Sequence, residues 1–125
     1  MRILLDTHVL LWLVDNSPRL TPKARTIIRE AERVFFSSAS IWEISIKIRL
    51  GKLRVDPDEL IEEMNKIGFE ELPVYARHAK GVAKLPLHHG DPFDRLLVAQ
   101  AKAEVMRLLT NDAQLTPYSD LVVTI

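Results

Sequence analysis

Short apolar runs alternate with longer segments of helical periodicity along the whole chain, and this alternation limits the fold more than any other feature. The runs that predict strands are residues 2–5, 34–36, 69–72, 107–109 and 121–125. The segments that predict helices are residues 8–15, 21–33, 39–50, 56–67, 74–84 and 92–104. Strands that alternate with helices are typical of a parallel sheet covered on both faces. We therefore predict a three-layer α/β/α sandwich with a mainly parallel central sheet, in one domain spanning residues 1–125.

Prolines and a glycine support these boundaries. All seven prolines fall at the edges of predicted elements, where proline is favoured. Thr21-Pro22 has the form of an N-cap followed by a proline at the first helical position. Gly51 stops the helix that precedes it.

The composition excludes several function classes. Seventeen basic side chains balance seventeen acidic ones, which argues against polybasic binding of nucleic acid but leaves room for a local basic patch. The chain has no cysteine, so disulfides and thiolate zinc sites are excluded. Asp6, Thr7 and His8 interrupt the apolar N-terminus, and no stretch reaches the roughly 18–20 apolar residues that a membrane span needs. We expect a cytoplasmic protein that makes no contact with a membrane.

Each acid near a strand end has an ordinary structural interpretation. Asp6 is a suitable N-cap for the helix that follows it. Ser40 and Glu43 fit a capping box, and Glu43 with Lys47 fits an ion pair one helical turn apart. Asp112 lies where aspartate commonly forms a turn. Taken singly, these acids indicate structure more than function.

The stretch HGDPFDRLLVAQA, residues 89–101, is harder to explain in this way. Asp91 and Asp94 open a helix that is apolar on most of its faces, so we expect that helix to be buried. The helix that opens at Asp56 is amphipathic, and its first acids can remain in solvent. The N-terminus of a buried helix must end inside the molecule or in a cleft, where an acid is unusual.

Three acids lie at the end of a predicted strand or one helical turn beyond it: Asp6, Glu43 and Asp112. The carboxyl ends of parallel strands share one edge of the sheet, where ligands bind in such folds. Carboxylates that converge repel one another unless a proton or a cation lies between them. Oxygen ligands suit Mg²⁺ or Mn²⁺, which can activate water against a phosphodiester. The residues thus indicate metal-assisted phosphodiester hydrolysis.

Four motifs carry a resemblance to a known family: LLDTHVLLW at residues 4–12, SASIWEISIK at 38–47, HGDPFDRLLVAQA at 89–101 and LLTND at 108–112. Together they resemble the PIN-domain nucleases, and within them the VapC-type toxins of bacterial and archaeal toxin–antitoxin pairs. The resemblance implies a PIN fold with Mg²⁺ or Mn²⁺ in an acidic pocket and endonucleolytic cleavage of RNA. It also implies a homodimer and inhibition by a cognate antitoxin, whose tail commonly lies over the pocket.

The same resemblance assigns roles to single residues. The catalytic and metal-binding acids of the family correspond to Asp6, Glu43, Asp94 and Asp112. Asp91 matches an extra acid of the subgroup, and its role is open between supporting the metal site and capping the helix. Hydroxyl side chains that the family often places near the metal correspond to Thr7, Ser38 and Thr110.

Basic residues form a run around the end of the helix that carries Glu43, namely Lys47, Arg49, Lys52 and Arg54. This run indicates either a solvated helix end or a strip that binds RNA phosphates. Arg95 is a further candidate for contact with RNA, with an ion pair to a nearby acid as the alternative.

The histidines and tryptophans indicate no additional chemistry. The histidines, at positions 8, 78, 88 and 89, match no zinc motif, so we predict surface or loop roles for them. Trp12 and Trp42 lie in apolar helices, where packing in the core or in a dimer is favoured over stacking on bases.

Two other functions fit parts of the pattern. A phospho-accepting receiver domain has a similar size and an acidic Mg²⁺ pocket, but it needs a lysine at the end of a late strand, where this chain has Thr110-Asn111-Asp112. A non-catalytic PIN-like module that binds RNA or protein is the second alternative. Cleavage of DNA is also open, because the metal mechanism makes no use of the 2′-hydroxyl.

Overall fold

A computed structural model describes residues 1–125 and contains one five-stranded sheet. The strands are β1 (Arg2–Leu5), β2 (Arg33–Ser37), β3 (Glu70–Leu72), β4 (Arg107–Thr110) and β5 (Val122–Thr124). Their order across the sheet is β3-β2-β1-β4-β5, and every neighbouring pair is parallel. The predicted three-layer sandwich is confirmed, with a sheet that is wholly parallel.

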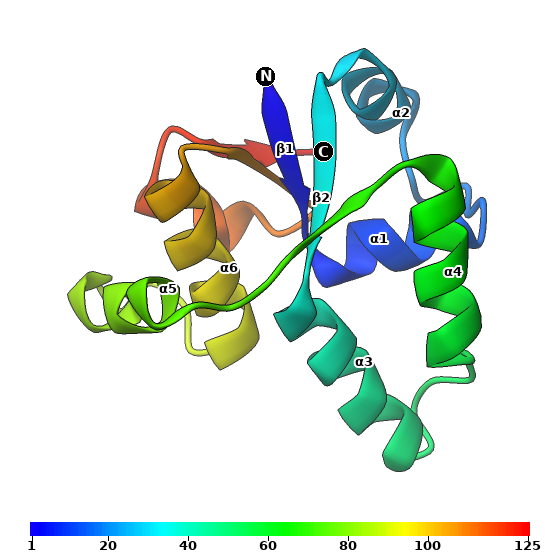
Figure 1. The fold of residues 1–125 in the computed structure, drawn as a ribbon. Coiled ribbons are helices and arrows are strands. Elements are labelled where there is room, and N and C mark those ends of the chain that lie inside the picture. Colours follow the sequence, from blue (N-terminus) through cyan, green and yellow to red (C-terminus); the bar gives the residue numbers. More distant parts are fainter.

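Helices cover both faces of the sheet (Figure 1). One layer consists of α1 (Thr7–Val14), α2 (Pro22–Glu30), α3 (Ser38–Arg49) and α4 (Pro57–Ile67). The other consists of α5 (Ala76–Gly81), η1 (Val82–Lys84), α6 (Pro92–Glu104) and η2 (Ala113–Tyr118), of which η1 and η2 are 3₁₀ helices. No helix combines the length and the apolar character that crossing a membrane requires.

The central strands β1, β2 and β4 are mainly apolar after their first residue because both faces of the sheet are buried there. Successive side chains of a strand point to opposite faces, so Ile3 and Leu5 join the core beneath α1 to α4, whereas Leu4 joins the core beneath α6. The middle of α6 is also buried, as its sequence predicts, with Leu97 and Val98 almost fully enclosed. The N-terminus of α6 therefore lies at the edge of the core.

Most element bounds agree with the sequence-based expectation to within two residues, but one helix end and one proline depart from it more clearly. The helix expected to continue to Arg33 ends at Glu30, because Arg33 is already the first residue of β2. Pro117 was expected at an element edge and instead lies inside the short 3₁₀ helix η2.

The order of the strands defines where a ligand can bind. The chain proceeds from β1 to β2 and β3 on one side and then returns to place β4 on the other side of β1. In open parallel sheets, the crevice outside the carboxyl ends of the strands at such a reversal is the usual ligand site. Here the reversal lies between β1 and β4, whose carboxyl ends are Leu5 and Thr110, and α1, α3 and α6 begin near the same end of the sheet (Figure 1).

Candidate metal centre

Asp6 follows β1 directly and is only 3% exposed. Its Oδ1 accepts the backbone N–H of Val9 at 2.9 Å, so it caps α1 as the sequence predicts. Its Oδ2 accepts a hydrogen bond from the hydroxyl of Thr110. Burial raises the pKa of Asp6 above its ordinary value, although both hydrogen bonds oppose the shift. Asp6 is therefore a helix cap and also a carboxyl group whose charge is costly to bury.

Thr110 connects Asp6 with the turn after β4. Its hydroxyl oxygen is fully buried, donates to Asp6 and accepts the backbone N–H of Asp112 at 3.0 Å. The Oδ1 atom of Asp112 accepts the backbone N–H of Gln114 at 2.9 Å, which caps η2. The predicted turn role of Asp112 is thus present, and Thr110 links its backbone to the carboxylate of Asp6.

The start of α6 places two carboxyl groups next to this edge. Asp91 is the N-cap, and its Oδ1 accepts the N–H groups of Phe93 at 2.8 Å and of Asp94 at 3.3 Å. The side chain of Asp94 is 22% exposed. Burial, together with the negative charges of Asp91, Asp6 and Glu43, raises the pKa of Asp94 to about 7. Asp91 therefore serves as the cap, whereas Asp94 faces the other acids.

Glu43 reaches the same cluster from the second turn of α3. The expected capping box of Ser40 with Glu43 is wrong. The N-cap of α3 is Ser37, so Ser40 already lies inside the helix. The hydroxyl of Ser37 also donates to the side chain of Gln100 on α6 at 2.6 Å, so the two helices are tied together beside the site. Glu43 is 7% exposed; its Oε2 pairs with Lys47 at 3.1 Å, and its Oε1 has no hydrogen-bond partner.

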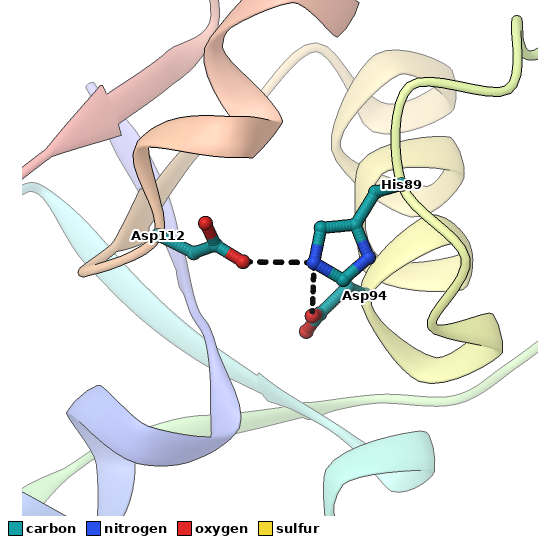
Figure 2. A group of neighbouring side chains, drawn as sticks. All are labelled: His89, Asp94 and Asp112. Carbon is teal, nitrogen blue, oxygen red and sulfur yellow. Dashed lines mark hydrogen bonds and ion pairs between the residues drawn. The ribbon is translucent and has the colours of Figure 1, made fainter.

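His89 is a member of the site that the sequence analysis missed. Figure 2 shows its ring between Asp112 and Asp94. Its Nε2 lies 2.9 Å from Oδ2 of Asp112 and 3.7 Å from Oδ2 of Asp94, and its side chain is 15% exposed. The expectation of a surface or loop role is therefore incomplete, since the residue lies on a loop whose side chain enters the acidic cluster. The only local signal was its position two residues before Asp91.

Two predicted hydroxyl residues have other partners. Thr7 is buried and donates to the hydroxyl of Ser40 at 2.9 Å. Ser38 accepts the backbone N–H of Val74 at 3.1 Å, which ties α3 to the segment after β3. Of the three hydroxyl residues expected near the metal, Thr110 alone is bonded to an acid of the cluster.

The predicted basic strip begins at the acidic cluster and extends away from it. Lys47 is the ion-pair partner of Glu43, and the exposed residues at the end of α3 and after it are Arg49, Lys52 and Arg54. The alternative of an ion pair between Arg95 and a nearby acid is wrong, and its contact with RNA stays a prediction. Its guanidinium donates to the carbonyls of Val82, Leu85 and Pro86 and to the hydroxyl of Tyr118. Arg95 therefore holds the loop between η1 and α6.

The other histidines show one further correction. His78 was expected at the surface or in a loop, and it is instead fully buried in α5. Its Nδ1 accepts the N–H of Tyr75 at 3.1 Å, and its Nε2 lies 2.8 Å from Glu104. These bonds satisfy a polar ring inside the core. His88 is exposed, with its ring against that of Tyr118 at 5.0 Å.

The residues from 3 to 120 match the model of the PIN domain. The chain belongs to the PIN domain family. No curated protein sequence matches the chain significantly.

Solved structures with the same fold support this assignment of the PIN domain. VapBC from Salmonella typhimurium bound to DNA aligns at a TM-score of 0.70, with 14% identity over 99% of this chain and 98% of that one. VapBC2 from Rickettsia felis, bound to a promoter DNA fragment, aligns at 0.69, with 13% identity over 100% and 98%. A toxin–antitoxin complex from Klebsiella pneumoniae aligns at 0.68, with 18% identity over 98% and 96%. At these identities the likeness shows the fold alone.

The acidic cluster of this chain has a chemistry that fits a divalent cation. One carboxylate oxygen, Oε1 of Glu43, is buried without a hydrogen-bond donor. Two carboxyl groups, those of Asp6 and Asp94, have a raised pKa because they are buried near other acids. Buried anionic oxygens of this kind cost free energy unless a cation or protons accompany them. Oxygen donors are the ligands that Mg²⁺ and Mn²⁺ prefer.

Proposed function

We propose that this PIN domain is a Mg²⁺- or Mn²⁺-dependent endoribonuclease of the VapC toxin type. The observation that carries the proposal is the gathering of acids at the carboxyl end of the sheet. Donor atoms of His89, Asp94 and Asp112 lie within 4.8 Å of one another. The negative charges of Asp6 and Glu43 also act on Asp94, and one buried oxygen of Glu43 is unpaired. Structural interpretations account for single members of this set but not for their convergence. Buried acids with raised pKa values are typical of functional sites, and a cation would offset their charges.

The four acids would hold the cation, and each is already constrained by the fold. Val9 and Thr110 orient the carboxylate of Asp6, and Gln114 and His89 orient that of Asp112. A bound Mg²⁺ or Mn²⁺ would lower the pKa of a water and neutralise charge on the phosphodiester. Since the pKa of Asp94 is about 7, its carboxyl group releases a proton when positive charge arrives beside it.

The surroundings of the acids suit a phosphate backbone. Three helices, α1, α3 and α6, begin near the cluster, and helix N-termini attract phosphate groups. The exposed basic residues that follow from Lys47 along α3 would bind further phosphates of the same strand. These features support a nucleic-acid substrate, and RNA is our proposal because the likeness to VapC toxins favours it.

A cognate antitoxin is the proposed inhibitor. The solved structures with this fold from S. typhimurium and R. felis are VapBC complexes, and the one from K. pneumoniae is a toxin–antitoxin complex. Carried over to this chain, that assembly would silence the nuclease by covering the acidic cluster. With an RNA substrate and an antitoxin partner, the proposed location of the protein is the cytoplasm.

We also propose that the chain forms a homodimer through α3. Trp42 and Leu50 are each 62% exposed and Ile46 is 37% exposed, and their spacing of four residues places them on one side of the helix. The ring of Trp42 meets that of Phe93 at 5.2 Å, which extends this apolar surface toward α6. Contiguous exposed apolar side chains favour an interface. Light scattering should give a dimer mass for the wild type and a monomer mass for Trp42→Ser.

One cleavage experiment tests the nuclease. Antitoxin-free protein is incubated with total cellular RNA and Mg²⁺ or Mn²⁺, beside Asp6→Asn, an EDTA control and Asp56→Asn. Like Asp6, Asp56 caps a helix, but it is exposed at the start of α4, so its variant controls for the loss of one carboxylate. We expect discrete fragments from the wild type and from Asp56→Asn only. Intact RNA in all lanes, with metal binding demonstrated, would favour a binding module without turnover.

A further inference from the structure

His89 contacts the acidic cluster through one ring nitrogen and its own loop through the other. Its Nδ1 accepts the backbone N–H of Asp91 at 3.0 Å. Its Nε2 lies 2.9 Å from the Oδ2 atom of Asp112 (Figure 2). Three donor atoms, from His89, Asp94 and Asp112, lie within 4.8 Å of one another. At that spacing the histidine could be either a ligand of the cation or a hydrogen-bond donor to an acid that holds it.

The bond to Asp91 decides between these two roles. A ring nitrogen that accepts a hydrogen bond carries no hydrogen, so the hydrogen of the neutral ring is on Nε2. A histidine that coordinates a metal through Nε2 needs that lone pair free and usually donates its Nδ1–H to an acceptor. In this structure the backbone N–H of Asp91 points at Nδ1, so a hydrogen on Nδ1 would clash with the hydrogen of that N–H. The Nε2–H of His89 therefore donates to Asp112.

The backbone around His89 keeps the ring in this position. Its N–H donates to the hydroxyl of Tyr118 at 2.9 Å, and its carbonyl accepts that same hydroxyl at 3.3 Å. Arg95, whose other bonds fasten the same loop, donates to the carbonyl of Pro86 at 2.9 Å. The N–H of Asp91 is fixed in turn, because the side chain of Asp91 caps α6. The ring orientation is therefore set by the loop and not by the acids.

We propose that His89 is a positioning residue, locked by the N–H of Asp91 as an Nε2–H donor that orients the carboxylate of Asp112 for the cation without coordinating the cation itself. This inference rests on the proposed metal-dependent function and names a residue that serves it. Asp112 then has one oxygen bonded to Gln114 and the other to His89, so both rotation and tilt of its carboxylate are restricted. Mutation of such outer partners of a ligand typically lowers the affinity for the metal by roughly 10- to 100-fold.

Two other histidines, His78 and His88, serve as comparisons for His89. His78 makes the same pair of bonds inside the core, from Tyr75 to Nδ1 and from Nε2 to Glu104. The same arrangement of bonds thus occurs twice in the chain, once in the core at His78 and once at the acidic cluster at His89. His88 is the matched control, because it neighbours His89 on the same loop, and its backbone N–H bonds to Tyr118 while its ring only packs there.

The test uses two amide substitutions, each of which replaces the ring but keeps a polar group near one of its two nitrogen positions. His89→Gln places an N–H donor near the position of Nε2, whereas His89→Asn places its amide near Nδ1 and cannot reach Asp112. Binding of Mn²⁺ is measured by calorimetry for both variants, for His89→Ala and for His88→Ala. We expect the affinity to fall by roughly tenfold or more in His89→Asn and His89→Ala. We expect His89→Gln and His88→Ala to stay close to the wild type.

A spectroscopic measurement separates the donor from a ligand. Electron spin-echo spectra of Mn²⁺ bound to the wild type should show no nitrogen coupling from an imidazole in its coordination sphere. Nitrogen-15 spectra of the metal-free protein should show a ring hydrogen on Nε2 of His89. Nitrogen coupling that is lost in His89→Gln would overturn the proposal and leave the nuclease intact. Unchanged Mn²⁺ affinity in His89→Asn would also overturn it. Absence of Mn²⁺ binding by the wild type would overturn the metal-dependent function and this inference together.

Discussion

The hydroxyl of Thr110 donates to the buried carboxylate of Asp6, although the two residues are 104 positions apart in the chain. The same hydroxyl accepts the N–H of Asp112. Thr110 thus links Asp6, which follows β1, with Asp112, which follows β4. The bond makes the relative placement of these acids a property of the sheet, since β1 and β4 are paired neighbours.

Replacing Thr110 should therefore weaken both the fold and the metal site. Thr110→Val keeps the shape but leaves one oxygen of Asp6 and the N–H of Asp112 without partners. We expect a loss of roughly 1–3 kcal/mol in the free energy of unfolding, measured by urea denaturation, and weaker binding of Mn²⁺. Thr110→Ser retains the hydroxyl and should restore most of both. Equal behaviour of the valine and serine variants would show that the hydroxyl is unimportant.

The raised pKa of Asp94 predicts how the stability of the metal-free protein depends on pH. The pKa is about 7 in the folded protein, against an ordinary value of 3.8, so the folded state holds this proton more tightly than the unfolded state. The resulting stabilisation is complete below about pH 4 and is lost as the pH rises through 7.

The variant Asp94→Asn removes this dependence, and we expect it to stabilise the metal-free protein at pH 8 by roughly 2 kcal/mol or more, with a much smaller effect at pH 5. Denaturation in urea with EDTA at both pH values measures the difference. A variant that is destabilised equally at both would contradict the assignment of a raised pKa to Asp94.

A divalent cation should stabilise the folded protein by occupying the acidic cluster. At a Mg²⁺ or Mn²⁺ concentration 100 times the dissociation constant, the gain is about 2.7 kcal/mol. A thermal melt with metal and with EDTA detects it as a reversible rise in the midpoint. Glu43→Gln should reduce the rise, because it removes the charge of the carboxylate that has an unpaired oxygen. Glu63→Gln, an equal change at an exposed position of α4, should leave the rise unaltered.

The basic strip predicts a salt-dependent affinity for RNA. Each lysine or arginine that contacts a phosphate of a single strand contributes roughly −0.7 to the slope of log affinity against log salt concentration. Replacing Arg49 and Lys52 by glutamine should therefore make the slope less steep by about 1.4. The control is Lys66→Gln on α4, whose side chain pairs with Glu62. Binding is measured with the Asp6→Asn variant so that the RNA stays intact, and equal slopes for all variants would remove the strip from the interface.

The sequence by itself determined the layers of the fold and the acids at the strand ends. Apolar runs such as residues 2–5 predict strands buried on both faces, and the apolar helix that begins at Pro92 predicts its own burial. These features depend on the periodicity of neighbouring residues, which is local information. For the same reason Asp6, Asp91 and Asp112 could be identified as caps or turn residues before their surroundings were known.

Only the tertiary structure decided which side chains meet. The bond of Ser37 to Gln100, the buried ring of His78 and the tethering of Arg95 to its loop all depend on partners outside their own helix or strand. The same holds for His89, whose ring reaches Asp112 on another element, 23 positions away. Hydrogen bonds of this kind leave no periodic signal in the chain, because they form when the order of the strands brings separate loops to one edge of the sheet.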